Sequence, residues 1–224
     1  PGCKHPYAVR SMINISGMSY GSLSRPAIQA LSRGAKMADC YLNTGEGGLS
    51  PYHLEGGCDI IFQIGTAKYG VRDEEGKFSE EKYRAITDKP EVKMTELKLA
   101  QGAKPGKGGI LPGNKVTEEI AEIRHIPAGQ DSISPNRHPE IDSCDDLIDF
   151  VCRLRKISGK PVGIKTVISS RRWLDELCEG IKARGTDSAP DFITVDGGDG
   201  GTGAAGGDRP DRGSAGRYAP GVDS

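Results

Sequence analysis

The chain has 224 residues, a formal net charge of −1 and 35% hydrophobic residues. This length suits one large domain or two small ones, and the near-neutral charge argues against a nucleic-acid or membrane-surface partner. No segment approaches the ~20 consecutive apolar residues of a membrane span, so we expect neither nucleic acid nor membrane as a partner.

Six short apolar runs alternate along the chain with patterns of helical period. The predicted strands lie within residues 12–16, 41–48, 59–66, 92–109, 161–169 and 191–198. The predicted helices lie within residues 25–40, 74–87, 117–126, 145–159 and 171–185. The fourth predicted helix, for example, has one apolar face, formed by Leu147, Phe150, Val151 and Leu154. It is predicted to end at Gly159.

This alternation predicts an α/β protein with parallel strands and helices packed outside them. The strands lack a polar–apolar alternation because both of their faces would be covered. Two architectures satisfy the pattern, an open doubly wound sheet and a (β/α)8 barrel. The end of the chain, residues 206–224, has few large apolar side chains, and we expect it to be disordered or foreign to the fold.

The six cysteines are scattered, and no C-x-x-C pair occurs among them. In a chain of this length the spacing predicts reduced thiols and a cytoplasmic protein. The histidines form no H-x-x-x-H pair either. We therefore expect no metal or iron–sulfur site built from this chain's own residues.

The glycines at Gly198, Gly200 and Gly203 match G-x-G-x-x-G, the dinucleotide fingerprint. A Rossmann turn belongs to the first βαβ unit, whereas this motif follows the last predicted strand. The alternatives are a phosphate-binding loop of a barrel and a plain surface turn. Since Asp196 and Asp199 would repel a phosphate, we expect them to face hydroxyl groups or to point outward.

Polar residues follow the predicted strands at the point where each strand ends. They are Ser16, Ser19, Asn43, Glu46, Gln63, Lys98, Gln101, Lys104 and Lys165. Because parallel strands end at the same edge, these residues are expected on one catalytic face.

Lys98 and Lys165 lie within apolar runs, where an unpaired charge is costly. The anionic partner is either the pyrimidine edge of a flavin or an internal carboxylate such as Glu96. Lys104 and Arg124 have the chemistry to hold the two carboxylates of a dicarboxylate substrate. The alternative for Arg124 is a solvated charge on a helix face.

Several long motifs are similar to those of a known family. They are ISGMSYGSLSRPAIQALSRGA, NTGEGGLSPYH, FQIGT, ELKLAQGAKPGKGGILPGNKV, DSISP, PVGIKTV and DFITVDGGDGGTGAA. In this order the chain resembles the FMN-binding synthase domain of glutamate synthase over nearly its whole length up to Ala205. Glutamate synthase proper, short single-domain relatives and the N-methylglutamate synthase subunit all remain possible as subfamilies.

The resemblance implies a (β/α)8 barrel that holds FMN and reductively aminates 2-oxoglutarate to L-glutamate through 2-iminoglutarate. Ammonia would come from a glutamine amidotransferase domain or subunit, and electrons from ferredoxin or an NAD(P)H-linked subunit. The cofactor would supply the hydride, and the protein would position and polarise the substrate.

The family's functional residues are carried over by motif. The resemblance implies flavin contacts for Met18, Ser19, Gln63, Lys98, Lys165, Gly197, Gly198, Gly200, Gly201 and Thr202. It implies 2-oxoglutarate binding for Gln101, Lys104 and Arg124. Glu46 and Lys104 would be catalytic, with Glu46 placed where ammonia arrives.

The chain also departs from the family pattern. Two further strand–helix units, the amidotransferase domain and the three cysteines of the family's 3Fe–4S cluster have no counterpart in the sequence. We therefore expect a truncated member, a partial TIM barrel with about six of eight β/α units, formed by residues 1–205 and followed by the tail 206–224. A catalytically inactive fragment is the alternative to an active enzyme.

Overall fold

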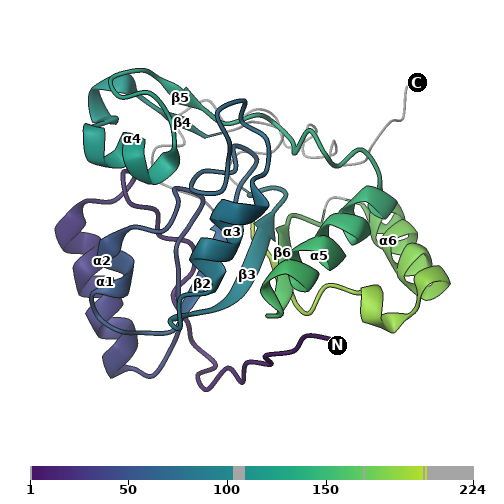
Figure 1. Ribbon diagram of the computed structural model, residues 1–224. Coiled ribbons are helices and arrows are strands. Elements are labelled where there is room, and N and C mark those ends of the chain that lie inside the picture. Colours follow the sequence, from purple (N-terminus) through teal and green to yellow (C-terminus); the bar gives the residue numbers. More distant parts are fainter. Residues whose placement is uncertain (1, 103–108, 169, 199, 201–224) are drawn as a thin grey trace.

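The structure, a computed structural model, describes residues 2–102, 109–168, 170–198 and 200 (Figure 1). Its main sheet has five parallel strands in the order β1-β2-β3-β6-β7. These strands are β1 (Leu42–Asn43), β2 (Ile60–Ile64), β3 (Val92–Lys98), β6 (Val162–Thr166) and β7 (Ile193–Val195). The expected tail 206–224 lies outside the described residues.

The strand order distinguishes between the two architectures left open by the sequence. Each successive strand of the main sheet joins the same side of the one before it, whereas a doubly wound sheet reverses direction at a switch point. The sheet also curls, since Thr194 on β7 hydrogen-bonds Glu96 on β3 across the intervening strand β6. The fold is therefore α/β with a curled parallel half-barrel, which confirms the predicted partial barrel.

The first predicted strand, residues 12–16, is reduced to a single parallel bridge between Ile15 and Leu42. Met12 and Ile13 are exposed, at 102% and 84%. The expectation of a full strand there was wrong, because Met12 and Ile13 are exposed and Ile15 alone of these apolar side chains packs against the main core in the described part of the chain.

Helices α1 (Arg25–Met37), α3 (Glu80–Thr87), α4 (Glu118–Arg124), α5 (Cys144–Ser158) and α6 (Arg171–Arg184) confirm the five predicted helices. Helix α5 begins with a capping box in which Ser143 and Asp146 exchange hydrogen bonds. It ends at Gly159, whose φ of 69° is the left-handed geometry that favours glycine. The short helix α2 (Pro51–Leu54) and the 3-10 turns η1 (Gly113–Lys115) and η2 (Thr186–Ser188) were not predicted. None of the helices in the described ranges combines the length and apolarity needed to cross a membrane.

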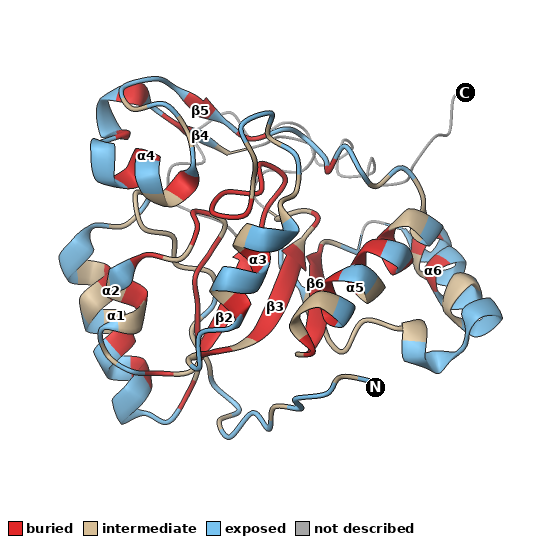
Figure 2. Ribbon diagram, viewed as in Figure 1, coloured by how far each residue is buried: buried red, intermediate tan, exposed pale blue. Residues whose placement is uncertain are grey.

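The two faces of the sheet differ in chemistry. The strands of the sheet are largely buried beneath α3 and α5 (Figure 2). The face toward the helices is apolar, and Phe62, Leu97 and Ile164 pack there with Leu147 and Leu154 of α5. Because side chains alternate along a strand, the intervening residues point to the inside of the curl. Those inner residues are mostly polar: Asn43, Gln63, Glu96, Lys98, Lys165 and Thr194.

The long connection between β3 and β6 carries a small substructure of its own. Strands β4 (Ile110–Leu111) and β5 (Ser132–Ile133) form an antiparallel ribbon beside α4. A second apolar cluster, which includes Leu111 and Ile120, joins the ribbon to that helix. The sequence did not predict this ribbon, because two-residue strands have no detectable period.

Candidate functional site

The carboxyl ends of the strands bring several predicted site residues together. Lys98, at the end of β3, donates to the Glu46 carboxylate at 3.2 Å and to the amide oxygen of Gln101. The side chains of Lys98 and Glu46 are 12% and 26% exposed. This ion pair is therefore partly shielded from water but still open to a small ligand.

Glu46 occupies a slot that glycines create. A Cβ built at Gly65 would lie 2.7 Å from the Glu46 side chain, and one at Gly109 would lie 2.9 Å from its Oε1. Any side chain at either position would force the carboxylate away from Lys98. The glycines that follow β2 and precede β4 thus fix where this carboxylate lies.

The second buried lysine is also paired with a carboxylate. Lys165 lies 3.0 Å from Asp196, with side chains 10% and 11% exposed, and Asp196 also accepts from the backbone N–H of Gly102 at 2.7 Å. The expectation that Asp196 faces hydroxyl groups or solvent was wrong, because this buried ammonium attracts it inward. Both lysines have internal partners, so neither requires a flavin for charge compensation.

Those partners are Glu46 and Asp196, not Glu96. Glu96 is 3% exposed and accepts from the side chains of Asn43, Gln63 and Thr194. Its role at the centre of the inner face was not recognised from the sequence, although its position two residues before Lys98 places both side chains on that face.

A buried histidine holds the loop of Met18 and Ser19. His53 Nδ1 accepts from the backbone N–H of Ser50, so its Nε2–H donates to the Met18 carbonyl at 2.8 Å. The backbone N–H of Met18 donates in turn to the carbonyl of Asn43 at 3.0 Å. Burial lowers the pKa of His53, which keeps the ring neutral in this role.

A second buried histidine holds the end of β3. His138 Nε2–H donates to the Lys98 carbonyl at 2.9 Å, and its Nδ1 has no partner among the described residues. Burial lowers its pKa to about 4. Neither histidine was among the predicted site residues, because a lone histidine has no signal in a sequence unless its neighbours are known.

The stability of the fold should depend on His138 between pH 4 and 6.5. The unfolded chain protonates this ring near pH 6.5, but the folded chain does so only near pH 4. Stability is therefore lost as the pH falls through this window. In His138→Gln, where the amide can still donate to the Lys98 carbonyl, we expect this loss, about 3 kcal/mol at most, to disappear. Urea unfolding of both proteins from pH 4 to 7 measures it.

The matched control is His5→Gln at an exposed histidine. It should leave the pH profile of the wild-type protein in place. An unchanged profile in His138→Gln would contradict the assignment of a neutral, buried ring.

Arg124, at the end of α4, is not the solvated charge that the sequence left open. It is 5% exposed, its guanidinium lies 4.9 Å from the ring centre of Tyr69, and its Nη2 donates to the Tyr20 carbonyl. Its Nε has no hydrogen-bond partner, and no carboxylate forms an ion pair with it in the described part of the chain. Burial lowers the pKa of this guanidinium while the nearby Glu46 charge opposes the shift.

The glycine-rich loop after β7 packs against the loop after β3. A Cβ built at Gly102 would lie 1.7 Å from the Gly197 carbonyl oxygen, so the two backbones are in direct contact. A Cβ at Gly197 or Gly198 would meet nothing within 4 Å, which leaves open space on their other side. Lys104, Gly201 and Thr202 lie outside the described residues.

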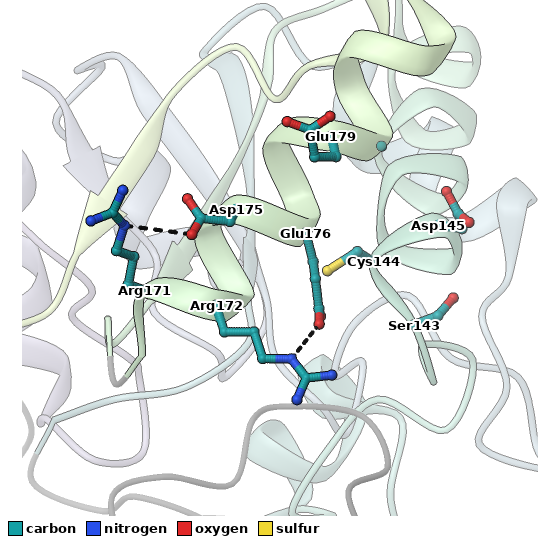
Figure 3. A pocket seen from close by; sticks show the side chains of 9 residues that line it. Ser143, Cys144, Asp145, Arg171, Arg172, Asp175, Glu176 and Glu179 are labelled. Atoms are coloured by element: carbon teal, nitrogen blue, oxygen red, sulfur yellow. Dashed lines mark hydrogen bonds and ion pairs between the residues drawn. The ribbon is translucent and has the colours of Figure 1, made fainter.

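A separate surface groove lies between the outer helices α5 and α6 (Figure 3). Its volume is about 610 Å³, and it is lined by residues that include Cys144, Arg172 and Glu176. Burial raises the pKa of the Cys144 thiol, and Arg172 is paired with Glu176 one helical turn away. The groove contains none of the predicted site residues.

The six cysteines are all free thiols. Within the described ranges, no group of three or more histidine, cysteine, aspartate or glutamate side chains has the arrangement of a metal site.

Known proteins resemble the chain over nearly all of this architecture. Residues 2–212 match the model of the conserved region in glutamate synthase. The glutamate synthase large subunit-like protein YerD of Bacillus subtilis is 47% identical over 88% of this chain and 37% of its own length. Archaeal-type glutamate synthase [NADPH] of Thermotoga sp. and archaeal glutamate synthase [NADPH] of Methanocaldococcus jannaschii are each 38% identical, over 83% of this chain and 33% of their own lengths.

The chain thus spans about a third of the length of these curated relatives. The matched region contains the strands, the glycine loops and every described site residue discussed above. The chain belongs to the glutamate synthase family.

Proposed function

We propose that this chain forms part of the catalytic barrel of an oxidoreductase that reductively aminates 2-oxoglutarate to L-glutamate. The observation that carries the proposal is Arg124, a buried guanidinium with no carboxylate partner among the described residues. A Cβ built at Gly47, the residue after Glu46, would lie 3.1 Å from the Nη2 of Arg124, so the guanidinium lies near the end of the strands where ligands of parallel barrels bind. A carboxylate of the substrate would balance its charge.

The chemistry of the inner face fits FMN. The ammonium groups of Lys98 and Lys165 offer donors and positive charge to a flavin ring, the Gln63 amide lies on the same face, and Met18 and Ser19 border the same edge. The open space beside Gly197 and Gly198 supports a place for a phosphate near backbone N–H groups. Gly200, Gly201 and Thr202 complete the phosphate-binding loop of this proposal.

In the proposed mechanism, Arg124, Gln101 and Lys104 bind and orient 2-oxoglutarate. Glu46, held by Lys98 and by its glycine slot, takes up and returns the protons released when ammonia replaces the keto oxygen to form 2-iminoglutarate. The chemistry that a bound FMN would supply is hydride transfer to the imine, which would give L-glutamate. The fixed ammonium of Lys98 keeps the Glu46 side chain oriented throughout.

The ammonia in this proposal comes from a glutamine amidotransferase domain or subunit. For the electrons, the names of the Thermotoga and Methanocaldococcus relatives specify NADPH. This favours an NADPH-linked donor over ferredoxin.

The test uses the purified full-length protein. We expect a flavin absorption band near ~450 nm and binding of 2-oxoglutarate by calorimetry. Arg124→Lys should keep the flavin and weaken 2-oxoglutarate binding by at least about tenfold, because a charged bidentate contact is lost. Arg33→Lys, at an exposed pair with Glu55, is the control. A colourless wild-type protein, or equal affinity in Arg124→Lys, would contradict the proposal.

A further inference from the structure

Glu96 makes an unusual set of contacts on the inner face of the sheet. Its Oε1 accepts from Asn43 Nδ2 at 2.8 Å and from Gln63 Nε2 at 2.7 Å, and its Oε2 accepts from Thr194 Oγ1 at 2.6 Å. The donors come from β1, β2 and β7, so one carboxylate connects four strands of the sheet.

None of these donors carries a charge. No ion pair reaches Glu96 from the described part of the chain, and the two nearby lysines are paired with Glu46 and Asp196. A carboxylate 3% exposed is costly to keep without a counter-charge. Glu96 therefore does not serve to neutralise a lysine. Its role is to be sought in how it orients the three side chains that donate hydrogen bonds to it.

An ionised carboxylate accepts hydrogen bonds and cannot donate them. Only the nitrogen end of the Gln63 amide can therefore face Glu96, and the amide oxygen Oε1 must point elsewhere. Asn43 is oriented in the same way, but its Oδ1 already accepts from the backbone N–H of Gly45 at 2.9 Å. Gln63 Oε1 has no donor among the described residues, so it remains available to a ligand.

We propose that Glu96 is a positioning residue that fixes the orientation of the Gln63 amide so that Oε1 is presented to the bound flavin. This inference rests on the proposed function, because it takes FMN as the ligand of the inner face. The matching donor on an isoalloxazine ring is its imide N–H. A neutral glutamine at position 96 can donate as well as accept, so it no longer determines which end of Gln63 faces the ligand.

The test is a double-mutant cycle in the full-length protein, with FMN affinity measured by fluorescence titration of the apoprotein. Glu96→Gln should weaken FMN binding about tenfold, the effect of one hydrogen bond to a buried group. Gln63→Leu should weaken it to a similar degree. In the Gln63→Leu background, Glu96→Gln should have little further effect, because the amide through which it acts is gone.

The matched control is Thr95→Val on the same strand. Thr95 faces the helices, where its hydroxyl lies 2.9 Å from the Tyr83 hydroxyl, so its loss perturbs β3 without touching the inner face. We expect this variant to bind FMN like the wild-type protein. The visible spectrum of bound flavin should change in Glu96→Gln and stay unchanged in Thr95→Val.

The outcomes separate the two proposals. A wild-type protein that does not bind FMN overturns the proposed function, and this inference with it. A wild-type protein that binds FMN, together with unchanged binding in Glu96→Gln or equal effects in both backgrounds, overturns the role of Glu96 alone. If Glu96→Gln does not fold, Glu96→Asp draws the carboxylate back from Gln63 and should weaken FMN binding similarly; wild-type affinity in that variant would also overturn the role.

Discussion

Replacing Glu46 by glutamine is expected to lower kcat for ammonia-dependent glutamate formation by about 10²–10⁴-fold, the range for a positioned acid–base group. Glutamine fills the same slot beside Gly65 and Gly109 and can still accept from Lys98, so the geometry of the site should survive. What is lost is the ability to take up a proton. Steady-state kinetics of the full-length enzyme, with ammonia and 2-oxoglutarate as substrates, measures the effect.

The matched control is Glu55→Gln, since Glu55 is paired with Arg33 at the surface near α2. It should leave kcat unchanged. FMN content should be equal in both variants. A Glu46→Gln enzyme with wild-type kcat would show that the proton leaves by another route.

The largest effect on stability is expected for Arg155→Ala. Arg155 on α5 and Asp191 form a buried ion pair at 2.9 Å, with side chains 7% and 8% exposed. The guanidinium also donates to the carbonyls of Asp187 and Ala189, which secures the turn before β7. Removing the guanidinium breaks this buried ion pair and the two hydrogen bonds to the turn, at a cost of about 3–5 kcal/mol in the free energy of unfolding. Urea denaturation at pH 7 measures this difference.

Arg153→Ala on the same helix provides the comparison. Arg153 pairs with Glu80, but their side chains are 50% and 51% exposed, and such surface pairs contribute about 0–1 kcal/mol. A loss of similar size in the two variants would mean that the Arg155 pair is far less important than its burial suggests.

The positions of the main strands could be predicted because the sequence pattern of each segment agrees with the strand that it forms. Runs such as residues 60–64 are apolar without alternation, as buried parallel strands require, and glycines follow them directly. The same local rule placed Glu46, Gln63, Lys98 and Lys165 at one edge. These predictions needed only the direction of each strand.

The pairing of side chains was not predictable in the same way. The sequence left the anionic partner of Lys98 and Lys165 open between a flavin and an internal carboxylate such as Glu96, and the carboxylates that pair with them are Glu46 and Asp196. Which carboxylate reaches which lysine depends on how far the sheet curls and on loops that approach one another through glycine, as at Gly102. These are properties of the assembled chain, and no spacing in the sequence encodes them.

The position of β6 in the sheet bears on how the chain folds. Strands β1, β2 and β3 follow one another closely, but β3 next pairs with β6 only after the whole connection from Lys98 to Val162. Closing so long a loop costs conformational entropy before the contacts between β3 and β6 can compensate for it. We therefore expect the N-terminal strands with α1 and α3 to assemble before β6 and β7 dock. An undocked β3 would present an open edge to other chains, so the rate of this docking step is expected to influence the folding yield.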